Sequence, residues 1–276
     1  EALDAAELGP DDIEQVLVTH AHPDHFGLAS RLREQGADVV TTKRVASVIG
    51  DFAGHFEFER EYFMDFLPRC GLGEETAKTV TGLPGEFLSY APPVEVDRIL
   101  ADGDTLSVDD TPLTARETEG HAASELLLEF DRGGRSQLVV GDHVLPQITP
   151  NPLLQAPEEP GAERPRMLPT YNDSLDALAD APPDRILPGH REIIEDPASR
   201  LQEIRAAHEE RTENVFDLVD GPTTPLDVMD GLFGDLPATE VFSGMSEAVG
   251  HLDVLVERER VRRRERGGLF VYERRQ

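Results

Sequence analysis

The sequence predicts an α/β sandwich, in which β-sheets are packed between layers of α-helices. Short apolar runs with strand character alternate along the chain with segments of helical periodicity. Clusters of Pro, Gly and charged residues separate these segments. At 276 residues the chain can bury a large core and hold one large domain with a smaller one beside it.

The expected strands and helices follow one another from the N-terminal side. The apolar run Val16–Val18 predicts a strand over 14–19, followed by a helix over 26–35 and a strand over 37–41. Further strands are expected at 99–100, 106–108, 113–117, 125–130, 137–141 and 185–188, with a helix over 171–179 before the last of them. The interval 154–169 is rich in Pro and Glu and is predicted to be a loop.

Two regions lie outside this alternation. In segment 50–93, helical spacing of Phe52, Phe56, Phe63 and Phe66 indicates a helical hairpin packed on the sandwich, with an apolar lid or a dimer contact as the alternative. Beyond residue 195, helices are expected at 197–218, 225–232 and 246–257, followed by a hairpin formed by 258–264 and 269–273. We therefore predict two domains, residues 1–195 and 196–276.

The composition is strongly acidic. The formal charge is −29, from 55 acidic and 26 basic residues, and the only lysines are Lys43 and Lys78. Because acids are spread along the whole chain, we interpret the bias as adaptation to high salt, where screening reduces self-repulsion. An acidic tail or a cation-binding surface, the competing interpretation, would concentrate the charge.

Other features narrow the setting. The sequence has no run of about 18 apolar residues and no basic start leading into an apolar run, so we expect a soluble, cytoplasmic protein without a membrane partner. The single cysteine, Cys70, excludes an intramolecular disulfide and a multi-cysteine zinc site. A metal ion would therefore be held by His, Asp or Glu.

Potential metal ligands gather where the predicted strands end. The stretch T-H-A-H-P-D-H-F-G (19–27) follows the first strand, and His121, Asp142 and His190 follow later strands, each directly after a glycine. Short loops at such exits can direct side chains into one shared cleft. Each residue alone is better explained as a helix cap or a solvated loop residue. The set as a whole predicts a metal site.

These motifs resemble the signature of the metallo-β-lactamase superfamily, T-H-x-H-x-D-H followed by a glycine-histidine, a glycine-aspartate and a late glycine-histidine. The resemblance covers residues 11–195 and implies an αββα sandwich with a site for two metal ions along one edge. It implies that one metal is held by His20, His22 and His121, that the second is held by Asp24, His25 and His190, and that Asp142 bridges them.

The residue types favour zinc, two ions per chain, because imidazole and carboxylate ligands suit Zn²⁺. His22 stands where di-iron relatives carry Glu, and Asp142 stands where zinc β-lactamases that open penicillins often carry Cys. A hydroxide bridging the two ions would be the nucleophile. The catalytic residues would be Asp142, through this bridge, and Asp24, which resembles the family's proton carrier for the leaving group. Metal binding is the first role expected of Asp24.

The run G-D-H-V-L-P-Q-I-T-P-N (141–151) resembles glyoxalase-II-like hydrolases, although Glu125 stands where glyoxalase II has a histidine beside the metals. We therefore predict a binuclear zinc-dependent hydrolase of a small ester, thioester or lactone. The alternative is an endoribonuclease of the same fold, because the arginine-rich run 258–266 lies in a C-terminal region that resembles a winged helix. A catalytically silent, interaction-only relative is the third hypothesis. The sequence leaves the oligomeric state open.

The resemblance also predicts an incomplete first sheet. Members of the family usually have two or more strands before the histidine-rich motif, and here nineteen residues precede His20. We therefore expect N-terminal strands to be missing from this chain.

Overall fold

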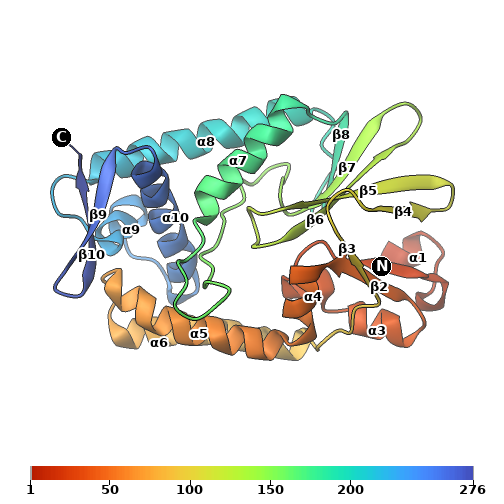
Figure 1. Ribbon diagram of the computed structural model, residues 1–276, viewed down its shortest axis with the longest axis horizontal. Coiled ribbons are helices and arrows are strands. Elements are labelled where there is room, and N and C mark those ends of the chain that lie inside the picture. The colour runs from red at the N-terminus through yellow and green to blue at the C-terminus, as the bar shows by residue number, and fades with distance from the viewer. Residues whose placement is uncertain (1, 276) are drawn as a thin grey trace.

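The computed structural model describes residues 2–275 and contains two larger β-sheets flanked by helices and a two-stranded C-terminal sheet (Figure 1). The first sheet is parallel, with strand order β1 (Gln15–Leu17), β2 (Asp38–Thr42) and β3 (Arg98–Leu100). The second sheet has its strands in chain order, antiparallel except for the parallel pair β7 and β8. Its strands are β4 (Thr105–Val108), β5 (Thr111–Thr118), β6 (Glu125–Asp131), β7 (Ser136–Gly141) and β8 (Arg185–Pro188). Every strand predicted before residue 195 is confirmed.

The helices lie on both sides of the sheets and in the C-terminal half. The short elements are α1 (Ala2–Ala5), η1 (Pro10–Asp12), α2 (Pro23–Phe26), α3 (Ala29–Glu34) and η2 (Leu83–Tyr90). The longer helices are α4 (Lys43–Gly50), α5 (Phe52–Arg69), α6 (Glu74–Gly82), α7 (Met167–Asp180), α8 (Pro197–Leu218), α9 (Pro225–Phe233) and α10 (Ala238–Glu257). The chain ends in the hairpin β9 (Val261–Arg266) and β10 (Leu269–Arg274).

The two sheets pack face to face, and helices cover their outer faces. On β2, Val40 points into the space between the sheets, whereas Val39 points outward to α3 and α4. On β6, Leu126 faces the other sheet, whereas Leu127 packs under α7 and α8. This alternation follows from the two-residue period of a strand and makes both faces of each sheet apolar. The layer order is therefore αββα, as predicted.

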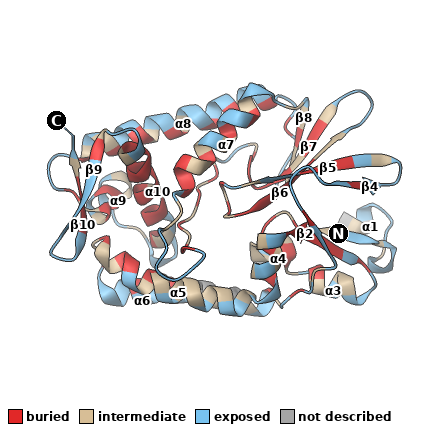
Figure 2. Ribbon diagram, in the orientation of Figure 1, coloured by how far each residue is buried: buried red, intermediate tan, exposed pale blue. Residues whose placement is uncertain are grey.

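A third packing region joins two segments that are distant in sequence. Phe63 and Phe66 of α5 are buried against the C-terminal helices and hairpin, with the Phe66 ring centroid 5.5 Å from that of Phe270. Helices α5 and α6 lie along one side of the molecule and meet the C-terminal elements at its far end, and α10 is buried along much of its length (Figures 1 and 2). At the other end of α5, Phe52 packs on Phe26 of the sandwich. Segment 50–93 thus forms the predicted helices, but it packs mainly on the C-terminal elements and not on the sandwich as expected, because its phenylalanines find their apolar partners there.

The C-terminal helices and hairpin are confirmed, with one difference in extent. Helix α10 begins at Ala238 rather than at residue 246, after the extended residue Pro237. Its first two turns contain Gly244, on which the Leu236 side chain packs closely: a Cβ atom there would lie 2.5 Å from Leu236 Cδ1. The similarity of this region to a winged helix and the division into domains at residue 195 stay predictions.

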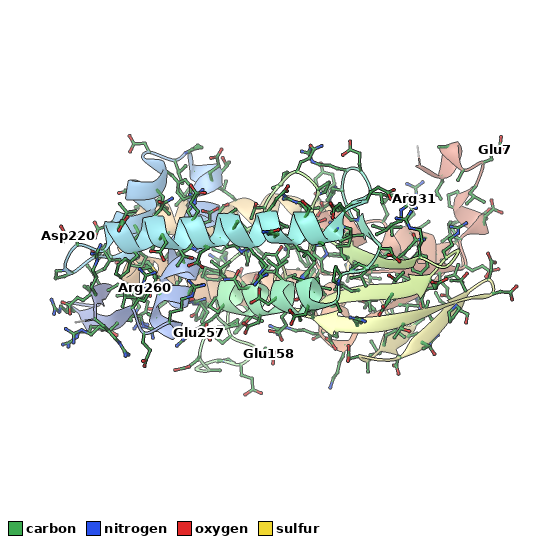
Figure 3. The ribbon with its side chains drawn as sticks, turned by 90° about the horizontal axis from the view of Figure 1, so that it is seen from above. Glu7, Arg31, Glu158, Asp220, Glu257 and Arg260 are labelled. Carbon is green, nitrogen blue, oxygen red and sulfur yellow. The ribbon has the colours of Figure 1, made fainter. Side chains whose placement is uncertain are left out.

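The acidic residues are spread over the surface. Glu7, Glu158, Asp220 and Glu257 are exposed and project from separate parts of the molecule (Figure 3). No helix within residues 2–275 combines the length and apolar character that crossing a membrane requires.

We expect salt to stabilise this protein. The melting temperature should rise when KCl is increased from about 0.1 M to about 2 M, because the Debye length falls from about 10 Å to about 2 Å and mutual repulsion of the acids weakens. Differential scanning calorimetry at both salt concentrations measures the effect, and sucrose at matched osmolality is the control for a general solute effect. A flat or falling melting temperature would contradict the halophilic interpretation.

Candidate metal centre

The predicted ligand residues come together at the edge where strands of both sheets end. His20 and His22 follow β1, and Asp24 and His25 lie on the short helix α2. The remaining three follow strands of the second sheet: His121 after β5, Asp142 after β7 and His190 after β8. The two sheets are joined at this edge by the Leu126 amide, which donates a 2.7 Å hydrogen bond to the Thr19 carbonyl oxygen.

Two glycines permit the close approach of these segments. A Cβ atom on Gly189 would lie 2.7 Å from His25 Cε1 and 2.8 Å from Asp142 Oδ1, so only glycine fits there. Gly141 has φ +54° and would place a Cβ atom 2.7 Å from Thr19 Oγ1. The predicted role of the glycines that precede the ligand residues is therefore seen in the structure at these two positions.

The first group of donors consists of three imidazoles. His22 Nδ1 lies 3.0 Å from His20 Nε2 and 3.1 Å from His121 Nε2. Ligands of a tetrahedral zinc ion at about 2.0–2.1 Å are separated by about 3.3 Å, close to these spacings. The three nitrogens are therefore arranged as the ligands of one ion would be.

The second group contains a carboxylate and two imidazoles. His190 Nε2 lies 3.2 Å from His25 Nε2 and 3.2 Å from Asp24 Oδ2. Asp142 adjoins both groups: its Oδ2 is 3.4 Å from His25 Nε2, and its carboxylate also clusters with His20. Asp142 Oδ1 is buried without a hydrogen-bond partner among the described residues. A buried carboxylate oxygen without a donor, surrounded by imidazoles, fits a metal ion.

The two groups differ in exposure. His20 is 0% exposed, whereas the side chains of Asp24 and His190 in the second group are 61% and 47% exposed. A ligand arriving from solvent therefore meets the second group first.

The electrostatics of the first group favour neutral imidazoles, the form that binds metals. Burial, and then the neighbouring His22, lower the pKa of His20. Burial and His121 lower the pKa of His22 to about 4. Burial likewise lowers the pKa of His121, although Glu125 opposes the shift. Each of these rings can therefore offer one nitrogen lone pair to a metal ion at neutral pH.

Asp142 and His25 shift each other in opposite directions. Burial raises the pKa of Asp142, but the hydrogen bond from His25 and the electrostatic effects of His25, His121 and His190 together outweigh it, and the net pKa is lowered. Burial lowers the pKa of His25, but the hydrogen bond to Asp142 and the negative charges of Asp142, Asp24 and Glu125 together outweigh it, and the net pKa is raised. Asp142 is therefore ionised at neutral pH, as a metal ligand must be.

Sequence reasoning missed a buried polar group behind the site. Glu125 Oε2 lies 2.8 Å from His143 Nδ1, and both side chains are fully buried. Ser174 of α7 lies 2.8 Å from the other ring nitrogen of His143. The signal was present in the sequence, because His143 directly follows Asp142 and Glu125 replaces the histidine of glyoxalase II.

All seven predicted residues lie together in the structure, in three overlapping groups of potential ligands. Their individual roles stay a prediction. An αββα sandwich with this His- and Asp-rich edge belongs to the class of metal-dependent hydrolases. The chain is a member of the metallo-beta-lactamase superfamily, whose family model matches residues 1–190.

Similar proteins support this assignment over nearly the whole chain. A Bacillus subtilis (strain 168) protein named "Probable metallo-hydrolase YqjP" is 29% identical over 263 residues, which cover 95% of this chain and 80% of the relative. The crystal structure of a metallo-beta-lactamase family protein from Thermus thermophilus aligns with TM-score 0.78 and 28% identity, covering 99% of this chain and 84% of that protein. A beta-lactamase domain protein from Burkholderia ambifaria aligns with TM-score 0.74 and 26% identity, covering 95% of this chain and 74% of the other.

Proposed function

We propose that this metal-dependent hydrolase binds two zinc ions and cleaves a small ester, thioester or lactone. The observation that carries the proposal is the position of Asp142 between two complete groups of donors, because a shared carboxylate is the usual link in a two-metal site. His20, His22 and His121 would hold the first ion, and Asp24, His25 and His190 the second.

Zinc at this site would supply a Lewis acid for the carbonyl oxygen and, at neutral pH, a hydroxide nucleophile. The chain does not then need a serine or cysteine nucleophile, and burial raises the pKa of its only cysteine, Cys70, to about 12. Asp24 is exposed next to His190, where its carboxylate can pass a proton to the leaving group as well as bind metal.

The choice of an acyl substrate is supported by the run 141–151, which resembles that of glyoxalase-II-like hydrolases. The name of the Bacillus subtilis relative gives metallo-hydrolase without a substrate. The presence of Glu125 in place of a histidine departs from glyoxalase II, so glutathione thioesters are not the favoured substrate.

The C-terminal arginines favour the small substrate over RNA. Arg258 pairs with Glu209, and Arg260 pairs with Glu213. Arg262, Arg264 and Arg266 share the carboxylate of Glu273. Because most of this run is paired with acids, it offers a weaker field to a phosphate backbone than its sequence indicates.

A substrate panel tests the proposal. We expect the metal-loaded full chain, in high salt, to hydrolyse members of a panel of thioesters, lactones and activated esters and not to cleave RNA. Replacing Arg262, Arg263 and Arg264 together with Gln should leave the rate of acyl hydrolysis within about threefold of the wild-type rate. These arginines could contribute phosphate contacts to a polyanion, but a small acyl substrate makes no such contacts.

Arg132→Gln, in the exposed turn between β6 and β7, is the matched control for lost surface charge. The assays should be repeated at low salt, where phosphate contacts are strongest. RNA cleavage by the wild type that is lost in the triple variant, without acyl hydrolysis, would overturn the proposal in favour of the endoribonuclease.

A further inference from the structure

His143 is fully buried, and hydrogen bonds hold both its ring and its backbone. On the ring, Nδ1 lies 2.8 Å from Glu125 Oε2, and Nε2 lies 2.8 Å from Ser174 Oγ. On the backbone, the carbonyl oxygen accepts a 2.5 Å hydrogen bond from the Tyr171 hydroxyl, and the amide donates to the Val140 carbonyl oxygen at 3.1 Å. Every polar atom of this residue therefore has a partner.

The ring contacts form a complete chain of hydrogen bonds. With the proton on Nδ1, His143 donates to the Glu125 carboxylate, and Nε2 accepts from the Ser174 hydroxyl. Ser174 Oγ in turn lies 2.8 Å from Thr118 Oγ1. The chain connects the start of β6, the loop after β7, helix α7 and the end of β5.

The neighbourhood leaves little room for His143 to move. A Cβ atom on Gly120, just before His121, would lie 2.8 Å from His143 Cε1 and 2.5 Å from Tyr171 Cδ2. The ring centroids of His143 and Tyr171 are 5.0 Å apart, with the planes nearly perpendicular. The loop that carries His121 is therefore packed directly on the His143 ring.

We infer that Glu125 and Ser174 are positioning residues that act through His143 to fix the Asp142 carboxylate at the metal centre. Asp142 precedes His143 directly, so the backbone that is held at His143 sets the direction of the Asp142 side chain. A carboxylate that adjoins two donor groups must be placed accurately for both, and outer partners of this kind typically change metal affinity by about 10- to 100-fold. The inference rests on the proposed zinc site but not on the identity of the substrate.

Zinc affinity provides the test. Competition with a chromophoric chelator, on the metal-stripped full chain, should show that Glu125→Ala and Ser174→Ala each weaken zinc binding by about tenfold or more. Glu125→Gln retains an oxygen that can accept a hydrogen bond from His143 Nδ1, so this variant should lose less zinc affinity than Glu125→Ala does. Glu129→Gln, at the other end of the same strand, where the side chain is half-buried and paired with Arg116, is the matched control and should bind zinc as the wild type does.

Two further measurements separate positioning from a general loss of stability. The melting temperature of each metal-stripped variant shows whether it is folded, and the visible spectrum of the cobalt-loaded protein reports the ligand geometry. Folded Glu125→Ala and Ser174→Ala variants with wild-type zinc affinity and an unchanged cobalt spectrum would overturn the inference. If Glu125→Gln loses as much zinc affinity as Glu125→Ala, the inference is also overturned. The charge of Glu125, rather than its hydrogen bond to His143, would then be responsible for the effect on zinc binding. If no acyl substrate is hydrolysed but the affinities change as expected, the proposed substrate fails and the positioning role stands.

Discussion

Asp142→Ala is expected to impair both metal sites at once and to reduce hydrolysis about 10³-fold or more. Its carboxylate adjoins His20 in one donor group and His25 and His190 in the other. Metal ions contribute several kcal/mol to transition-state stabilisation, and about 1.4 kcal/mol corresponds to tenfold in rate. Elemental analysis of dialysed protein and the initial rate of acyl hydrolysis measure the two effects.

Asp110→Ala removes an exposed carboxylate outside the site and should leave zinc content and rate unchanged. The comparison with His190→Ala is also informative, because that change removes a donor from the exposed group alone. A wild type that is active with one metal per chain, or an Asp142→Ala variant that retains two, would contradict the binuclear proposal.

Asp253→Ala is expected to lower the free energy of unfolding by about 3–5 kcal/mol, because it leaves a buried guanidinium without its partner. The side chains of Arg164 and Asp253 are 7% and 6% exposed and form an ion pair between the loop before α7 and helix α10. Burial lowers the pKa of Arg164, but Asp253 outweighs it and the net pKa is raised, so the arginine stays charged. Urea unfolding at fixed salt measures the loss.

The double replacement Arg164→Met with Asp253→Leu should restore most of this stability, since an apolar pair can replace a buried ion pair at little cost. Arg258→Ala breaks the exposed pair with Glu209 and should cost less than about 1 kcal/mol. A loss of less than about 1 kcal/mol in Asp253→Ala would show that this pair does not stabilise the fold.

The sandwich and the position of the site follow from local features of the sequence. Strands such as β6 are recognised from their apolar runs, and the ligand residues follow strands that run in the same direction, β5, β7 and β8 in the second sheet, and so end at the same edge. This is why His20, His121 and Asp142 could be placed together without a structure. The residues alone predicted a metal site, and the division of the ligands between two metal ions came from the resemblance to a known family.

The features that could not be predicted depend on contacts between distant positions. The pairing of Glu125 with His143 needs two side chains 18 positions apart to be buried side by side, and neither shows a periodic signal. The early start of α10 was missed because Gly244 disfavours helix locally, and its contact with Leu236 is not visible in the sequence pattern. The packing of Phe66 on Phe270 likewise has no local signature.

The shared core of α5, α6 and the C-terminal elements has a consequence for how this chain folds during synthesis. Arg69 at the end of α5 pairs with Glu265, 196 positions later. At roughly 5–20 residues per second, the ribosome needs on the order of 10–40 s to make the intervening chain. The α6 part of this core is made soon after α5, but Phe242 and Phe270, whose rings pack on Phe63 and Phe66, are made much later. Part of the apolar side of α5 therefore stays without its partners until the hairpin of β9 and β10 has been made and completes this core.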